Sequence, residues 1–132
     1  MTKPSYYDSK EWEHLLLCEI TNETEDHAEM LLTTTDACQN PHGFLHGGIQ
    51  SFAVDEYAMK FLYRTFPAYR FLTVRLSIDY IKPIRLGTFK FGIKIIDVDL
   101  TTNLGHAIIT LCGISGTVLT RAGFEFAMYK KK

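Results

Sequence analysis

The residues of this chain that are best suited to chemistry lie between positions 40 and 55. The segment Asn40-Pro41-His42-Gly43-Phe44-Leu45-His46-Gly47-Gly48 precedes an apolar stretch that contains Asp55. The first amide groups of a helix have no internal partner and carry the positive end of its dipole. Because glycine lets a ligand approach the backbone closely, a helix that begins at Gly47 could stabilise a carbonyl oxygen that gains negative charge. Alternatively, the glycine pair only turns the chain into the helix.

Asp55 adds a carboxylate to this segment. A charged group inside an otherwise apolar helix is unfavourable unless it is solvated, paired or functional. Glu56 follows directly and points about 100° away around the helix, so one of the two acids could be the helix's contact with solvent. From these residues alone, a functional Asp55 and a paired structural Asp55 remain alternatives.

The element that must position these groups is a helix over Gly47–Tyr63, ending near Arg64–Pro67. The segment contains no proline, and it contains glycine only at its start. Its apolar residues leave hardly any polar face: Ile49, Phe52, Ala53, Val54, Tyr57, Ala58, Met59, Phe61 and Leu62. A helix that is apolar on most sides is normally enclosed by the rest of its domain.

Most of the remaining sequence predicts strands. Polar and apolar residues alternate over Leu72–Tyr80, which places Thr73, Arg75 and Ser77 on a polar face and Leu72, Val74, Leu76, Ile78 and Tyr80 on a buried one. A short helix is expected at Ser9–Leu17 and a loop at Gln39–Gly43. Further strands are expected at Cys18–Glu23, Ala28–Thr35, Phe89–Asp99, His106–Ile114 and Val118–Tyr129. Short turns between consecutive strands predict an antiparallel sheet around the helix, an α+β architecture.

The composition is that of one soluble globular domain over residues 1–132. The chain has 46% hydrophobic and 22% charged residues, and its net charge is −1, so we expect neither nucleic acid nor a membrane as partner. Cys18, Cys38 and Cys112 are widely spaced, which favours reduced thiols and a cytoplasmic protein. The closing residues Lys130–Lys132 form either a local anion patch or a solvated tail.

Several other chemistries find no support in the sequence. His42 and His46 are four residues apart, but proline and glycine make a helical metal face unfavourable there, and no third ligand is evident. The chain has no Gly-x-Ser-x-Gly elbow, phosphate-binding loop or dinucleotide fingerprint. We therefore expect neither a metal nor a separate cofactor.

The spacing around His46 resembles that of a known family. His46-Gly47-Gly48 has Asn40 six residues before the histidine, Gly43 three before it and Asp55 nine after it. This pattern is similar to that of the hotdog acyl-CoA thioesterases of the phenylacetate-pathway branch. The stretch from Val74 to Gly87 resembles the strand and turn that follow the helix in these proteins. The resemblance implies a hotdog fold, in which an antiparallel sheet wraps around a long central helix.

The resemblance also implies roles for individual residues. Asp55 would act as a general base toward water or as a nucleophile that forms a mixed anhydride. The Gly47 N–H would polarise the thioester carbonyl, and Asn40 and Thr73 would hold the water. His46 would shape the turn into the helix beside the substrate, together with Gly48.

Helix geometry adds a prediction about assembly. Gly47 and Asp55 are eight residues apart in one helix, which separates their backbones by about 12 Å. Both must lie within about 3 Å of one reacting group. Two copies related by a two-fold axis can satisfy this requirement, so we expect a homodimer, or a dimer of dimers.

The substrate is expected to be an acyl-CoA whose acyl group the sequence does not specify. Arg75, Lys82, Arg85 and Arg121 could bind the phosphates of coenzyme A or be ordinary surface cations. The aromatic residues Phe44, Phe52, Tyr57 and Phe61 could line an acyl pocket or belong to the core. Two alternatives to a thioesterase are a hotdog dehydratase or hydratase and a non-catalytic acyl-CoA-binding module.

Overall fold

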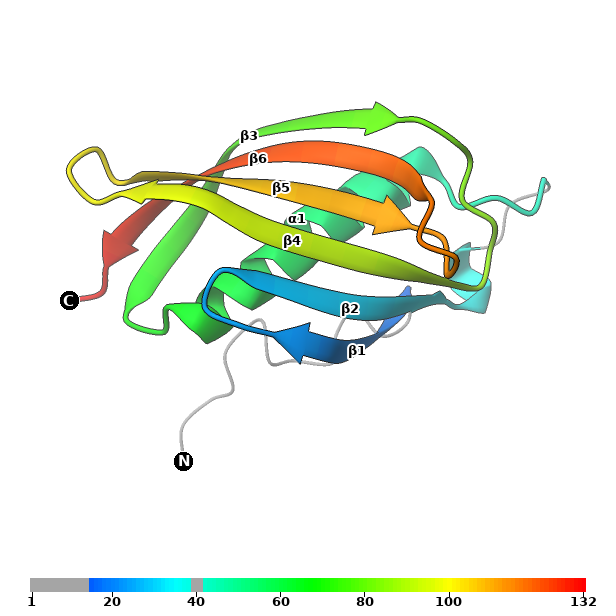
Figure 1. Cartoon of the computed structure of the whole chain (residues 1–132), viewed down its shortest axis with the longest axis horizontal. Coiled ribbons are helices and arrows are strands. Elements are labelled where there is room, and N and C mark those ends of the chain that lie inside the picture. Colours follow the sequence, from blue (N-terminus) through cyan, green and yellow to red (C-terminus); the bar gives the residue numbers. More distant parts are fainter. Residues whose placement is uncertain (1–14, 39–41) are drawn as a thin grey trace.

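The fold consists of one long helix held by a curved antiparallel sheet. The computed structural model describes residues 15–38 and 42–132 (Figure 1). The elements are β1 (Leu16–Glu23), β2 (His27–Thr34), a short 3₁₀ turn η3 (Asp36–Cys38), α1 (Gly47–Thr65), β3 (Tyr69–Tyr80), β4 (Thr88–Asp99), β5 (Leu104–Cys112) and β6 (Val118–Lys130). The strands are ordered β1-β2-β4-β5-β6-β3, and every neighbouring pair is antiparallel. The predicted architecture is confirmed.

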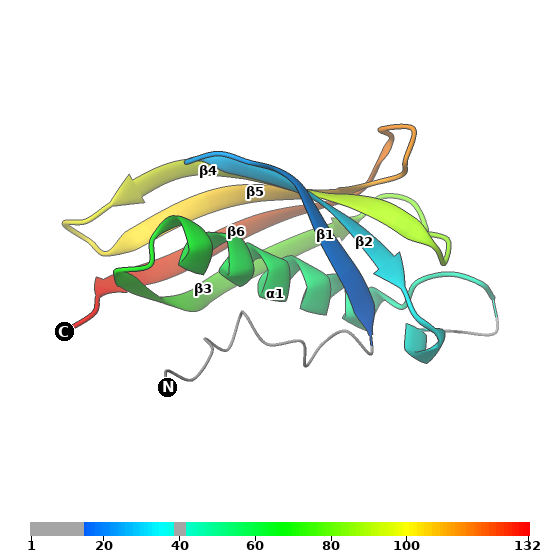
Figure 2. The same cartoon turned by 90° about the horizontal axis from the view of Figure 1, so that it is seen from below.

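The helix α1 lies along the concave face of the sheet (Figure 2). Its fully buried side chains include Ala53, Val54, Ala58 and Phe61, which join a core to which the strands contribute Phe89, Phe91 and Phe126. Burying a large apolar side chain contributes about 1.5–3 kcal/mol relative to leaving it exposed. The sheet thus holds the helix, and the helix holds Gly47 and Asp55.

The start of α1 is determined by a side-chain cap. His46 has an extended backbone, and its Nδ1 accepts a hydrogen bond from the Gly48 N–H at 2.9 Å. At the other end, the Phe66 N–H donates to the Leu62 carbonyl and Pro67 follows. The helix therefore runs two residues beyond the predicted Tyr63 and ends within the predicted Arg64–Pro67 region.

The first predicted helix is not confirmed. Leu16 and Leu17 belong to β1, where they pair with Thr34 and Thr33. Leu16 is buried and Leu17 exposed, which is the alternation of a strand. Leu15 lies in a turn, and residues 9–14 of this prediction lie outside the described residues, as do Gln39, Asn40 and Pro41 of the predicted loop.

The prediction for the faces of β3 is right for Leu76 and Ile78, which pack against the core, and wrong for the start of the strand. Thr73 pairs with Phe126 and Arg75 pairs with Glu125, so Val74 is an extra residue that forms a bulge. Thr73 therefore faces the helix like the buried Phe126, whereas Arg75 faces outward. In addition, β3 is an edge strand, and Leu72 and Val74 are 63% and 51% exposed instead of buried.

The outer face of the sheet carries a row of alternating charges. His106 of β5 lies opposite Asp97 of β4 and Glu125 of β6, and its two ring nitrogens contact one carboxylate each at 2.7 Å. Arg75 of β3 is next in the row, opposite Glu125. The hydrogen bonds to Asp97 and then Glu125 raise the pKa of His106 above its ordinary value of 6.5.

This row predicts a pH-dependent contribution to stability. The pKa of His106 is higher in the folded than in the unfolded protein. Its contribution to stability is therefore complete below the pKa of the unfolded state, and it is lost as pH rises through the pKa of the folded state. We expect the free energy of unfolding of wild type to exceed that of His106→Gln by the largest amount at about pH 6, and this difference to shrink at higher pH. Urea titrations of both proteins across this range measure the difference, and a constant difference would contradict the prediction.

Candidate active site

Asp55 and Thr73 are in direct contact. Asp55 lies in the middle of α1 with its side chain partly exposed, and the bulge in β3 turns Thr73 toward it. The Thr73 hydroxyl donates a hydrogen bond to Asp55 Oδ1 at 2.5 Å. Among the described residues no hydrogen bond involves Asp55 Oδ2, which can therefore accept a proton from another molecule. The carboxylate is thus oriented by a neighbouring strand and remains accessible.

The N-terminus of α1 offers one amide donor. Gly48 N–H donates to His46 Nδ1, and the Ile49 and Gln50 N–H groups donate to the His46 carbonyl at 3.0 and 3.1 Å. In the part of the chain that the structure describes, the Gly47 N–H has no acceptor. It is therefore the group of the first turn that can bind an external oxygen.

Tyr80 packs over this N-terminus from the end of β3. Its hydroxyl donates to the Gly47 carbonyl at 3.1 Å, and its ring lies 3.6 Å from where a Cβ on Gly47 would be. The sequence pattern indicated only a core residue here, yet Tyr80 is 52% exposed. Sequence reasoning missed this contact because it joins two segments 33 residues apart.

The two halves of the site are separated within one chain. Gly47 and Asp55 both lie in α1, so their backbones are about 12 Å apart along the axis. Thr73 contacts Asp55, and Tyr80, seven residues later at the end of β3, contacts Gly47. One chain thus carries a carboxylate and an amide donor that do not meet.

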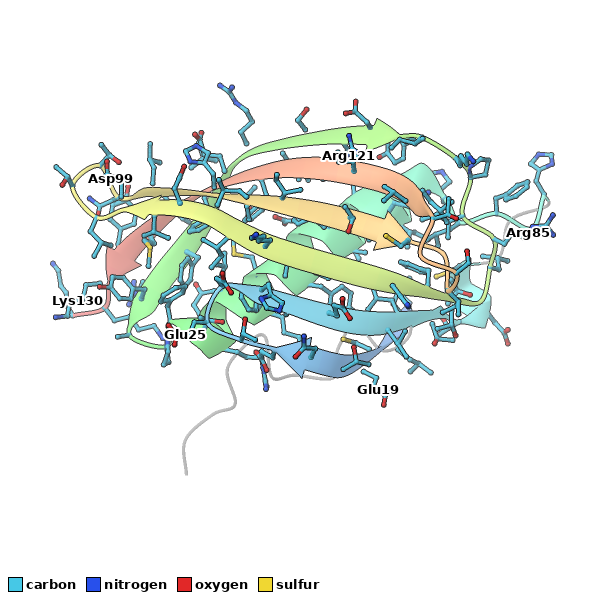
Figure 3. The ribbon with its side chains drawn as sticks, in the orientation of Figure 1. Glu19, Glu25, Arg85, Asp99, Arg121 and Lys130 are labelled. Atoms are coloured by element: carbon cyan, nitrogen blue, oxygen red, sulfur yellow. The ribbon has the colours of Figure 1, made fainter. Side chains whose placement is uncertain are left out.

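The basic residues predicted to contact coenzyme A fall into two groups. Arg75 and Arg121 lie on the outer face of the sheet, away from the Asp55 side. Lys82 and Arg85 are exposed in the connection between β3 and β4. Two backbone hydrogen bonds join this connection to the segment before α1: Leu45 N–H donates to the Ile84 carbonyl, and Leu86 N–H donates to the Gly43 carbonyl. Figure 3 shows Arg85 at this end of the molecule. Only Lys82 and Arg85 lie near the N-terminal end of α1.

The aromatic candidates for an acyl pocket also divide. Tyr57 and Phe61 belong to the buried core, and the Tyr57 ring packs edge-on against Phe91 at 6.1 Å. Phe44 and Phe52 are partly exposed. The structure therefore leaves these two as candidates for contact with an acyl group.

Metal and disulfide chemistry are not built into the described part of the chain. Across residues 15–38 and 42–132, no group of three or more His, Cys, Asp and Glu side chains is placed to hold a metal ion. Cys18, Cys38 and Cys112 are free thiols. No described helix is long and apolar enough to cross a membrane.

Solved structures share this fold over most of their length. A Streptococcus mutans protein bound to acetyl-CoA matches with a TM-score of 0.76 and 19% identity, covering 88% of this chain and 91% of its own. A hypothetical thioesterase from Streptococcus pneumoniae with coenzyme A matches with a TM-score of 0.77 and 15% identity, and the match covers 88% of each chain. A thioesterase from Haemophilus influenzae matches with a TM-score of 0.79 and 15% identity, and the match covers 93% of this chain and 85% of its own.

Sequence comparison gives a narrower match. No curated protein matches the chain. The family model described as the thioesterase superfamily matches residues 42–102, which contain Gly47, Asp55, Thr73 and Tyr80. The phenylacetate-pathway branch stays a prediction. The chain thus has the hotdog fold, and its residues 42–102 are similar to the thioesterase superfamily.

Proposed function

We propose that the protein is an acyl-CoA thioesterase that hydrolyses a thioester to a free acid and coenzyme A. The observation that carries the proposal is the pair of groups on α1: a carboxylate oriented by Thr73, and a Gly47 N–H that has no acceptor among the described residues. Acetyl-CoA and coenzyme A in two structures of the same fold support this ligand class.

The chemistry follows from these two groups. Asp55 Oδ2 accepts a proton from a water molecule, whose oxygen attacks the thioester carbonyl carbon. The Gly47 N–H stabilises the resulting oxyanion. Collapse of the tetrahedral intermediate breaks the carbon–sulfur bond, and the thiolate takes the proton from Asp55. Direct attack by Asp55 Oδ2, forming an anhydride that water then hydrolyses, is the second route for the same residues.

A panel of acyl-CoA esters tests this function. We expect the purified protein to release free thiol from at least one aryl, short or medium aliphatic acyl-CoA. A dehydratase or hydratase would change the acyl chain without releasing thiol, and a binding module would bind the ester without turnover. Absence of thiol release across the panel would contradict the proposed function.

The free edge of β3 supports a dimer. Leu72, Val74 and Tyr80 of this edge strand, and Ile81 directly after it, are each 48–63% exposed. A long, apolar, uncovered edge strand tends to pair with another chain. We therefore propose that two copies join through β3.

One antiparallel register of β3 on itself also completes the site. This register is centred on Ser77. It places the apolar Leu76 opposite the partner subunit's Ile78, and the positive Arg75 opposite the negative Asp79 of the partner subunit, and both kinds of cross-strand pair are favourable. Because Val74 is an extra residue in its bulge, Thr73 then lies opposite the partner subunit's Tyr80. Thr73 contacts Asp55 and Tyr80 contacts Gly47, so this pairing brings Asp55 toward the partner subunit's Gly47.

The register predicts a specific cross-link. Two Ser77→Cys side chains would face each other across the two-fold axis, at a Cα separation that a disulfide accepts. We expect mild oxidation to produce a covalent dimer on a non-reducing gel. Asp79→Cys is the matched control, since its two copies would be more than about 10 Å apart. Equal cross-linking of both variants, or of wild type, would contradict this register.

Tyr80 is expected to support the oxyanion donor. Tyr80→Phe keeps the ring against Gly47 and removes only the hydrogen bond to its carbonyl. We expect kcat to fall about 3- to 10-fold, the worth of one hydrogen bond, with little change in KM, because the donor acts mainly in the transition state. Steady-state kinetics on the best ester measure both constants, and an unchanged kcat would remove Tyr80 from this role.

A further inference from the structure

A pocket with a basic rim and aromatic walls lies at the C-terminal end of α1. Its volume is about 540 Å³. The walls include Tyr63 of α1, Phe71 of β3 and Tyr129 of β6, and the rim carries Arg70, Lys130 and Lys132. The Phe71 N–H donates to the Tyr63 hydroxyl at 3.1 Å, and their rings pack edge-on at 5.1 Å. These contacts give the pocket a formed wall.

Among the described residues that line this pocket, every charged side chain is positive. No aspartate or glutamate lines it, whereas each of three other pockets in the described part of the chain contains a carboxylate. Lys131 adds a further cation, since its Nζ lies 5.6 Å from the centre of the Tyr63 ring. Aromatic faces bind a nucleobase by stacking, and a group of cations binds phosphate.

We propose that this pocket binds the phosphorylated nucleotide end of coenzyme A. The inference rests on the proposed thioesterase function and identifies where the substrate's large anionic part is held. An apolar acyl group would leave the three rim cations without a partner, so the nucleotide fits the charge better.

The position of the pocket agrees with this assignment. Phe71 and Leu72 of the pocket directly precede Thr73, which contacts Asp55. Tyr63 lies eight residues beyond Asp55 in α1, about 12 Å along the axis. The pantetheine arm of coenzyme A, which separates the thioester from the nucleotide, would cross this gap.

The proposed dimer adds a basic residue from the second subunit. Within one chain, Lys130 and Arg85 lie at opposite ends of the molecule (Figure 3). In the register centred on Ser77, the two copies of β3 run antiparallel, and Thr73 lies opposite the partner subunit's Tyr80. Two residues further along, Phe71 therefore lies opposite the partner subunit's Lys82. Lys82 was expected from the sequence to bind coenzyme A, and the dimer would place it beside this pocket.

A paired kinetic measurement tests the assignment. The variant Arg70→Gln/Lys130→Gln is compared with wild type on an acyl-CoA and on the same acyl group attached to pantetheine, which lacks the nucleotide. We expect KM for the acyl-CoA to rise about tenfold or more with kcat nearly unchanged, and no change with acyl-pantetheine. Lys90→Gln/Lys94→Gln removes two cations from β4, away from this pocket, and should leave the kinetics with both substrates unchanged.

Direct binding separates this proposal from the proposed function. We expect adenosine 3′,5′-bisphosphate to bind wild type in a calorimeter and to bind the Arg70→Gln/Lys130→Gln variant at least about tenfold more weakly. If this result is obtained with a protein that hydrolyses no thioester, the pocket stands and the thioesterase function falls. Equal binding by both proteins, no binding by wild type, or an equal rise in KM for acyl-CoA and acyl-pantetheine would each overturn the nucleotide pocket.

Discussion

Asp55→Asn is expected to lower acyl-CoA hydrolysis by about 100-fold or more while the protein remains folded. Asparagine keeps the shape of the side chain, and its amide oxygen can still accept the hydrogen bond that Thr73 donates. It cannot take a proton from water, nor can it act as an anionic nucleophile. The loss should therefore appear in kcat, measured by thiol release, with the thermal unfolding midpoint nearly unchanged.

Glu56→Gln is the matched control for this change. It removes one negative charge from the neighbouring position of the same helix, where the side chain points about 100° away from Asp55. We expect the activity of this variant to stay near that of wild type. Near-normal turnover in folded Asp55→Asn would remove Asp55 from the mechanism, and inactivation by Glu56→Gln alone would show that the neighbouring acid is the reactive one.

The helix was predictable because its evidence is local. A run of 17 residues from Gly47 to Tyr63, whose apolar residues leave hardly any polar face, predicts an enclosed helix, and the structure extends it only to Thr65. The motif likewise placed Gly47 at the first turn. The capping bond from Gly48 N–H to His46 Nδ1 agrees with the prediction that His46 shapes this turn.

The face of β3 was not predictable in the same way. Alternation in the sequence assumes an unbroken period of two, whereas the bulge at Val74 arises from pairing with β6. The strand's own residues therefore gave the wrong side for Thr73. The exposure of Leu72 reflects the place of β3 at the sheet edge, which depends on the order of all six strands.

Contacts between distant segments were also beyond sequence reasoning. Thr73 contacts Asp55 across 18 residues and Tyr80 contacts Gly47 across 33. The resemblance named Thr73 as a site residue, but nothing in the sequence indicated Tyr80 in this role. The pocket rim likewise combines Arg70 with Lys130, which belong to the paired strands β3 and β6.

Two inactive variants are expected to restore activity when their subunits exchange. The proposed site combines Asp55 of one subunit with the Gly47 N–H of the other, so Asp55→Asn and Gly47→Val each damage both sites of their own homodimer. A Cβ at position 47 makes only ordinary contact with the Tyr80 ring, so the fold should accept the substitution. The larger valine side chain would block the approach of the thioester carbonyl.

In a heterodimer of the two variants, one site carries both changes and the other carries neither. Random mixing makes about half of the dimers heterodimers, each with one intact site, so about a quarter of wild-type activity should return. The measurement is thiol release after mixing under conditions that exchange subunits, with exchange established by co-purification of differently tagged chains. Recovery near a quarter would support a site shared between two subunits, and confirmed exchange without any recovery would contradict it.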